Sequence, residues 1–142
     1  MDAEGLAESD ELLEHLDAAA CTRLLAATTF GRLAVVAEGK PVIVVLNHVV
    51  EGSDVLFRTG EGALIARLTD GRAVAAVYEV DSAFPVGESG WSVIATGQLV
   101  RESDPAVAAA AVDRIRAWAH GDREVVLRLR VGELTGRRVG AL

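Results

Sequence analysis

The stretch from Pro41 to Thr59 constrains the fold more than any other part of the sequence. It holds two apolar, valine-rich runs, VIVVLNHVV and VLFRT, on either side of the acidic turn EGSD. β-Branched residues favour strands, and a proline fits the first position of a strand better than a later one. We therefore predict two antiparallel strands, at residues 42–50 and 55–59, joined by a short turn.

The rest of the chain continues this pattern of strands. The run GRLAVVAEGK predicts a strand at residues 32–37 that forms a hairpin with the strand at 42–50. Further strands are predicted at residues 72–80, 91–102 and 124–131. Gly97 is expected to make a bulge or a bend, and GELTGRRVG is expected to be a turn followed at most by a short last strand. Helices are predicted to begin at Asp17, at Glu61 and at Ser103 or Asp104.

Six antiparallel strands in a meander, with short helices at the corners, predict a mainly β protein built as a small barrel. Residues 1–16 are expected to form an N-terminal tail, and residues 17–142 a single domain. Side chains fill the interior of a barrel of this size, so a large planar ligand has to lie on its outside. A half-site on the outside is commonly completed by a second subunit, which predicts a homodimer.

Composition and charge exclude several classes of function. The chain has 142 residues and a formal net charge of -7, so it lacks the basic face that nucleic acid binding requires. No apolar run approaches the roughly 20 residues of a membrane span, and the acidic start MDAEGLAESDELLEHLD is unlike a signal peptide. The single cysteine, Cys21, agrees with a reducing compartment. We expect a cytoplasmic protein that binds neither nucleic acid nor a membrane.

The end of the strand at 55–59 carries the residue types of an anion site. Arg58 offers a bidentate charge and Thr59 a hydroxyl, while Gly60 and Gly62 let the backbone approach a ligand ahead of the predicted helix. This combination suits a phosphate group. The same residues also fit an ordinary turn after a strand, and the pattern by itself leaves both interpretations open.

Five segments, taken in order, resemble the pyridoxamine 5′-phosphate oxidase-like proteins, most of all their short actinobacterial members: GRLAVVAEGKPVIVVLNHVV, VLFRTGEGALIARL, RAVAAVYEVD, SGWSVIATGQLV and VVLRLRVGELTGRRV. The resemblance runs from about Asp17 to Val139. It implies a homodimeric split β-barrel that binds FMN at the dimer interface, or in some branches FAD, a deazaflavin or haem. It also implies a flavoprotein whose activity is the oxidoreduction of a small molecule.

The resemblance implies where such a cofactor binds. The strand at 42–50 would run beside the isoalloxazine ring, and the strand end at 58–59 with the turn after it would contact the phosphate. The strand at 91–102 would approach the flavin, often from the second subunit. The cofactor-binding residues so implied are Val44, Val45, Asn47, Arg58, Thr59, Gly62, Ala63, Trp91 and Ser92.

Two positions depart from the family pattern. After the glycine the family usually carries a serine or threonine and then a lysine or arginine, where this chain has Ala63 and Leu64. A hydroxyl and a cation are therefore missing, and each charge-assisted bond is worth roughly 1.5–3 kcal/mol. Arg67, one turn further along, is a candidate replacement. The chain end, TGRRVGAL, lacks the basic motif of authentic pyridoxamine phosphate oxidases, so vitamin B6 oxidation is not predicted.

Alternative functions stay open at this point. The barrel could be a cofactor-free dimer with a binding or regulatory role, or it could bind haem with His48 as the ligand. His48 would otherwise be a partly exposed residue of the barrel surface. No catalytic residue is identified, and His15, His48 and His120 lack metal-ligand spacing, so no metal site is expected.

Overall fold

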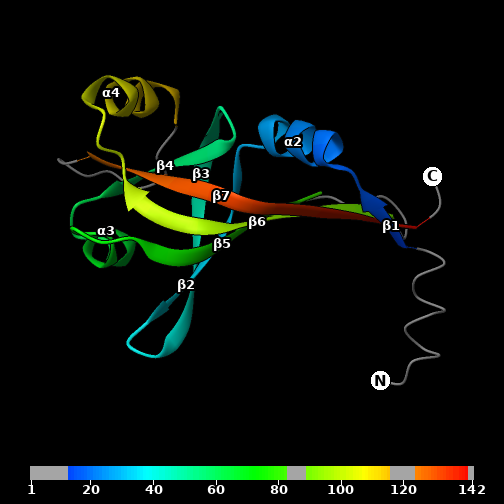
Figure 1. Cartoon of the computed structure of the whole chain (residues 1–142), viewed down its shortest axis with the longest axis horizontal. Coiled ribbons are helices and arrows are strands. Elements are labelled where there is room, and N and C mark those ends of the chain that lie inside the picture. Colours follow the sequence, from blue (N-terminus) through cyan, green and yellow to red (C-terminus); the bar gives the residue numbers. More distant parts are fainter. Residues whose placement is uncertain (1–12, 83–88, 116–123, 141–142) are drawn as a thin grey trace.

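In the structure, a computed structural model that describes residues 13–82, 89–115 and 124–140, seven antiparallel strands form one sheet (Figure 1). Their order is β1-β7-β4-β3-β2-β5-β6, and β6 pairs again with β7. Six strands therefore close into a ring, which confirms the predicted six-stranded antiparallel barrel, and β1 lies outside the ring on β7. The strands are β1 (Leu13–Leu16), β2 (Phe30–Ala37), β3 (Lys40–Glu51), β4 (Asp54–Gly60), β5 (Val74–Asp81), β6 (Gly90–Arg101) and β7 (Glu124–Val139).

Two strand predictions need correction. The expected tail at residues 1–16 ends in a strand, because Leu13–Leu16 pairs with the last residues of β7. The predicted turn in GELTGRRVG is wrong, since β7 runs without a break to Val139 and pairs with β6 along its length.

The predicted irregularity at Gly97 is confirmed as a register shift against β7. Gly97 pairs with Val131 and Thr96 with Glu133, so Gly132 is the extra residue of a bulge. A Cβ at Gly97 would lie 1.9 Å from the carbonyl oxygen of Arg130, so only glycine fits at this position.

Three helices pack around the described barrel. Helix α2 (Ala18–Ala27) begins as predicted, with the Asp17 carboxylate accepting a hydrogen bond from the Ala20 amide at 2.8 Å. Helix α4 (Pro105–Arg114) is capped in the same way by Asp104. Helix α3 (Leu64–Leu68) is much shorter than predicted and begins at Leu64 instead of Glu61. Among the residues that the structure describes, no helix has the length and apolar character needed to cross a membrane.

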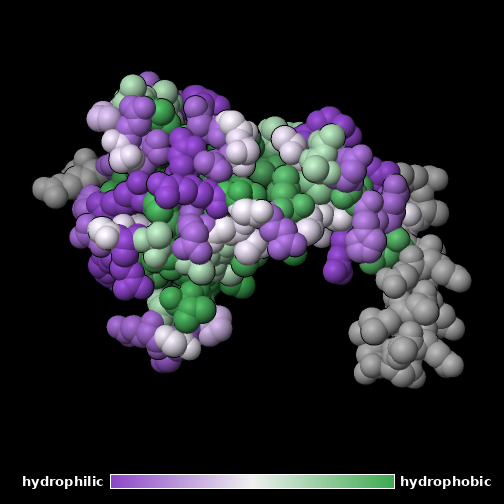
Figure 2. Space-filling model, in the orientation of Figure 1, coloured by the Kyte–Doolittle hydropathy of each residue, from purple (hydrophilic) through white to green (hydrophobic). Residues whose placement is uncertain are grey.

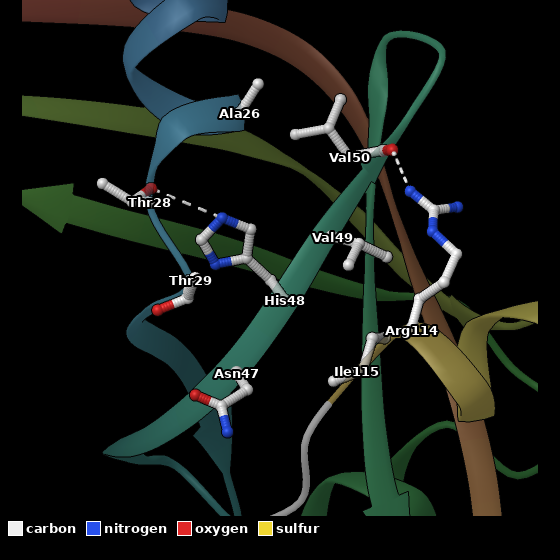
Figure 3. A pocket seen from close by; sticks show the side chains of 9 residues that line it. All are labelled: Ala26, Thr28, Thr29, Asn47, His48, Val49, Val50, Arg114 and Ile115. Atoms are coloured by element: carbon white, nitrogen blue, oxygen red, sulfur yellow. Dashed lines mark hydrogen bonds between the residues drawn. The ribbon is translucent and has the colours of Figure 1, made fainter.

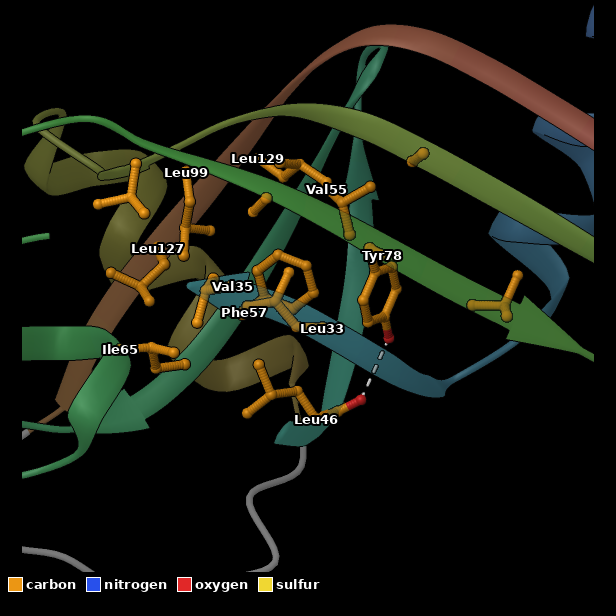
Figure 4. Close-up of a cluster of buried hydrophobic side chains, with 14 of the residues drawn as sticks. Leu33, Val35, Leu46, Val55, Phe57, Ile65, Tyr78, Leu99, Leu127 and Leu129 are labelled. Atoms are coloured by element: carbon orange, nitrogen blue, oxygen red, sulfur yellow. Dashed lines mark hydrogen bonds between the residues drawn. The ribbon is translucent and has the colours of Figure 1, made fainter. Parts of the chain in front are cut away.

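The interior of the ring is filled by apolar side chains (Figure 4). Leu33, Phe57 and Tyr78 are fully buried there, together with leucines from β6 and β7. A second, smaller cluster lies between α4 and the outer face of β4 and β7, around Leu56 and Ala111. Because the interior is packed with side chains, a ligand the size of a flavin ring has to bind on the outer wall or at an opening of the barrel.

Candidate functional site

Strand β3 changes partners halfway along its length, and this opens the wall of the barrel. Residues 40–47 pair with β2, whereas β4 pairs only with residues 48–51, from His48↔Phe57 to Glu51↔Asp54. Beyond Phe57, β4 continues alongside β7. No described strand therefore covers the β4-facing edge of residues 40–47. Backbone groups on such an edge are available to a ligand, because nothing in the ladder uses them.

The predicted site residues lie on both faces of the wall around this opening. Val44 and Ala63 are partly buried against the main core, and Thr59 shares the inward face of β4 with Phe57. Val45 lies on the opposite face of β3 and is 47% exposed. Asn47 lines a cavity that is described below.

Two predicted residues, Trp91 and Ser92, lie far from Thr59 in the same chain, although the strand register places Ser92 only three strands across from Asn47. Trp91 pairs with Arg138 near the end of β7, whereas Thr59 pairs with Val125 near its start. Thirteen residues of extended strand correspond to roughly 40 Å along the strand. Figure 1 shows the two ends of β7 at opposite ends of the molecule. One chain therefore does not bring all the predicted residues together.

Arg58 has a set of partners that the sequence did not indicate. Its guanidinium donates to the carbonyl oxygens of Val112, at 3.1 Å, and Ile115, at 2.9 Å, which lie at the end of α4. It also forms a 2.6 Å ion pair with Glu124, and this hydrogen bond holds the pKa of the Glu124 carboxyl below its usual range. Arg58 thus anchors α4 on the outer face, which differs from the expected phosphate contact. Strand alternation explains the difference, because neighbouring residues such as Arg58 and Thr59 point to opposite faces.

The turn between β4 and α3 is open to solvent. A Cβ built at Gly60 or Gly62 would meet no atom within 4 Å. The Ala63 amide donates to the Gly60 carbonyl oxygen at 3.1 Å, and Ala63 gives α3 no side-chain cap. With only five residues, α3 aligns few peptide dipoles, so the strong helix N-terminus expected from the sequence is not formed.

A cavity of about 550 Å³ lies between the ends of α2 and α4, over the second half of β3 (Figure 3). His48 forms part of its floor and is only 3% exposed, so the expectation of a partly exposed surface histidine is wrong. The cavity is lined by Ala26, Thr28, Thr29, Asn47, His48, Val49, Val50, Arg114 and Ile115.

Both ring nitrogens of His48 have hydrogen-bond partners. Nε2 lies 3.0 Å from the Leu25 carbonyl oxygen, which can only accept, so we assign the proton to Nε2. Nδ1 then accepts from the Tyr78 hydroxyl at 2.6 Å. Ligation of a haem iron by His48 would require one of these buried bonds to break.

Lowering the pH is expected to destabilise the protein through His48. Burial lowers the pKa of His48 from its ordinary value of 6.5, although the hydrogen bond to Leu25 acts in the opposite direction. The unfolded chain therefore takes up a proton at a higher pH than the folded chain does. The contribution of His48 to stability should be constant above about pH 6.5 and should decrease as the pH falls from there towards the lowered folded-state pKa.

Urea unfolding between pH 8 and pH 5 measures this effect. A His48→Leu variant should lose the decrease that begins near neutrality, whereas replacement of the exposed His15 by glutamine should keep it. An identical pH profile for the wild-type and His48→Leu proteins would contradict the prediction.

The outer face of β2, β3, β5 and β6 exposes a group of apolar side chains, which we call the apolar face. It consists of Val36, Ile43, Val45, Val77 and Ile94, with exposed fractions from 36% to 68%. Figure 2 shows hydrophobic residues along the protruding β2–β3 hairpin. A groove of about 600 Å³ on this side is lined mainly by apolar atoms. Solitary exposed apolar residues are common, but a contiguous group marks an interaction surface.

Arg32, Glu79 and Asp81 lie on the same outer side of β2 and β5. Arg32 forms ion pairs with Glu79 at 3.0 Å and with Asp81 at 3.1 Å. Burial and the neighbouring Asp81 raise the pKa of Glu79. In the part of the chain that the structure describes, no three His, Cys, Asp or Glu side chains are grouped as metal ligands would be.

Comparisons with known proteins agree with the resemblance. The family model described as pyridoxamine 5′-phosphate oxidase matches residues 17–138. An uncharacterized protein of Mycobacterium tuberculosis is 30% identical over 130 residues, which are 89% of this chain and 86% of that protein.

Solved structures share the fold. The FAD binding protein of Mycobacterium smegmatis superposes with a TM-score of 0.71 at 29% identity, over 89% of this chain and 98% of that one. An FAD and heme binding protein from the same organism superposes with a TM-score of 0.70 at 18% identity, over 92% of this chain and 74% of that one. At 18% identity, the second comparison shows only that the two proteins share a fold.

Proposed function

This chain belongs to the pyridoxamine 5′-phosphate oxidase family, and on that premise we propose that it binds a flavin nucleotide between two copies of itself and uses it in the oxidoreduction of a small molecule. The observation that carries the proposal is the uncovered edge of β3 beside Thr59 and the open turn at Gly60–Gly62. The FAD-binding relative from M. smegmatis, at 29% identity, supports a flavin as the ligand.

The residues around the opening fit a flavin nucleotide. The backbone N–H and C=O of Val45 point to the uncovered edge and suit the pyrimidine edge of the ring, which needs both donors and acceptors, and Asn47 adds an amide. The backbone groups of Val44 point to β2, so Val44 contributes its side chain. The Thr59 hydroxyl and the turn at Gly62 suit the phosphate. Because FMN is the part common to FMN and FAD, we propose that these residues hold the FMN portion in either case.

A homodimer completes the site in this proposal. Trp91 and Ser92 are roughly 40 Å of strand away from Thr59, so a flavin whose phosphate lies at Thr59 would meet them in a second copy in this proposal. The apolar face provides a surface on which two copies can associate. The same face on both partners is what a twofold-symmetric dimer uses.

The chemistry in this proposal is supplied mainly by the cofactor. A bound flavin accepts and donates hydride or single electrons, and the protein positions it and sets its electrostatic environment. The residues of this chain bind the phosphate, align the ring edge and shield one side of it. We propose a cytoplasmic location, in keeping with the single, buried thiol of Cys21.

Titration with flavins tests the proposal. The purified protein should show flavin absorption in the visible range, or should quench the fluorescence of added FMN or FAD at one flavin per chain. A deazaflavin and haem are titrated in parallel as the competing cofactors. A protein that takes up neither FMN nor FAD would contradict the proposal, and uptake of nothing at all would favour the cofactor-free dimer.

A further inference from the structure

We propose that Arg67 supplies the cation that binds the flavin phosphate in this chain. The proposal rests on the proposed function and assigns the phosphate subsite to a residue outside the strand end at 58–59. It also predicts that the site prefers phosphorylated flavins to riboflavin.

The side chain of Arg67 folds back over the open turn. Its Nη1 donates to the carbonyl oxygen of Gly62 at 3.2 Å, although Arg67 lies on α3, five residues later. The guanidinium is exposed and uses one of its five N–H donors in this contact. An anion placed against the backbone of Gly60–Gly62 therefore lies within reach of the donors that remain.

Two other arginines near the turn, in the described part of the chain, are already paired with carboxylates. Arg58 is paired with Glu124 at 2.6 Å and lies on the outer face under α4. Arg101 is paired with Glu61 at 3.2 Å and donates to the Ala66 carbonyl oxygen at 2.8 Å.

Arg67 differs from both. Among the described residues, it donates to a neutral carbonyl oxygen and forms no ion pair with a carboxylate. Leu64, at the start of α3, adds only an apolar side chain. The Glu61 carboxylate beside the turn would repel a phosphate, but its ion pair with Arg101 reduces that repulsion. Within residues 13–82, 89–115 and 124–140, a phosphate at the turn therefore has the guanidinium of Arg67 beside it without a carboxylate partner.

FMN and riboflavin differ only in the phosphate, so comparing them distinguishes binding of the phosphate by Arg67 from an effect of Arg67 on the whole flavin site. FMN and riboflavin are titrated into the wild-type protein and into Arg67→Ala, Arg67→Lys, Leu64→Lys and Arg72→Ala variants. Arg72 is the matched control, because it is an exposed arginine just beyond α3 and its loss changes the net charge equally.

Loss of Arg67 should weaken FMN binding roughly ten- to hundredfold, the effect of one charge-assisted contact, and should leave riboflavin binding unchanged. Arg67→Lys should retain part of the affinity, and Arg72→Ala all of it. Leu64→Lys should tighten FMN alone, because it adds a cation beside the same turn. High salt should reduce the preference for FMN in the wild type and have little effect in Arg67→Ala.

Equal weakening of FMN and riboflavin in Arg67→Ala, or no change in either, would overturn the assignment while leaving flavin binding in place. Failure of the wild-type protein to bind either ligand would overturn the proposed function as well. Because Arg67 and Arg72 are exposed, their variants should keep the wild-type unfolding midpoint. Measuring this midpoint for every variant, including Leu64→Lys at its half-buried position, ensures that affinity is compared among folded proteins.

Discussion

An Ile43→Glu variant is expected to be a folded monomer that no longer binds flavin. Ile43 is 68% exposed on the β2–β3 hairpin, so a glutamate there is solvated in a single chain and harmless to the barrel. In a twofold dimer built on the apolar face, each copy would bury one unpaired carboxylate. At about 3 kcal/mol for each of the two carboxylates, such burial raises the dissociation constant of the dimer by roughly four orders of magnitude. Flavin binding should fail with it, since the proposed site takes Trp91 and Ser92 from the second copy.

Light scattering after size exclusion, together with FMN titration, measures both effects. Ala110→Glu is the control, because it places the same charge on an exposed position of α4, away from the hairpin. It should remain a dimer with unchanged affinity. A dimeric Ile43→Glu protein would show that the interface lies elsewhere, and a monomer with full flavin affinity would show that one chain holds the whole site.

Local patterns in the sequence predict the strands and caps well because they depend on neighbouring residues. Runs rich in valine and bounded by turn residues identify β2 to β6, and Asp17 and Asp104 cap their helices as expected. The turn predicted in GELTGRRVG was wrong because the glycines of a turn and those of a β-bulge cannot be told apart in the sequence. Gly132 is the extra residue of a bulge, and Gly136 leaves room for Cys21, whose sulfur would lie 2.7 Å from a Cβ there. Both reasons depend on residues that are distant in the chain.

The candidate site was less predictable because its residues act through distant partners. In the sequence, Arg58 has the features of a phosphate ligand. Its ion pair with Glu124, 66 residues later in the chain, and its contacts with α4 become visible only in the fold. Alternation along β4 was the available signal, since it separates Arg58 from Thr59. His48 gave no such signal, because its burial depends on Tyr78, 30 residues away.

A Tyr78→Ala variant is expected to lose about 3–5 kcal/mol of unfolding free energy, the usual cost of removing a large buried ring. Tyr78 is fully buried and packs edge-on against Phe57, with ring centroids 4.7 Å apart. The space left by the ring cannot be filled by a larger residue at the neighbouring position 31. A Cβ at Gly31 would lie 2.4 Å from the Glu79 carbonyl oxygen, so the backbone would have to move. Since a domain is stable by only about 5–15 kcal/mol, a large share of the stability should be lost.

The Tyr78→Phe variant isolates the hydroxyl from the ring. Burial raises the pKa of Tyr78, so its hydroxyl stays protonated and donates to His48 Nδ1 at 2.6 Å, with the Leu46 carbonyl oxygen 3.1 Å away. Its removal leaves a buried acceptor without a partner and should cost about 1–3 kcal/mol. The double variant Tyr78→Phe/His48→Leu should lose less than the sum of the single losses, because the unpaired Nδ1 is removed too. Urea unfolding of the four proteins at pH 8 measures this coupling, and strictly additive losses would mean that Tyr78 and His48 stabilise the barrel independently.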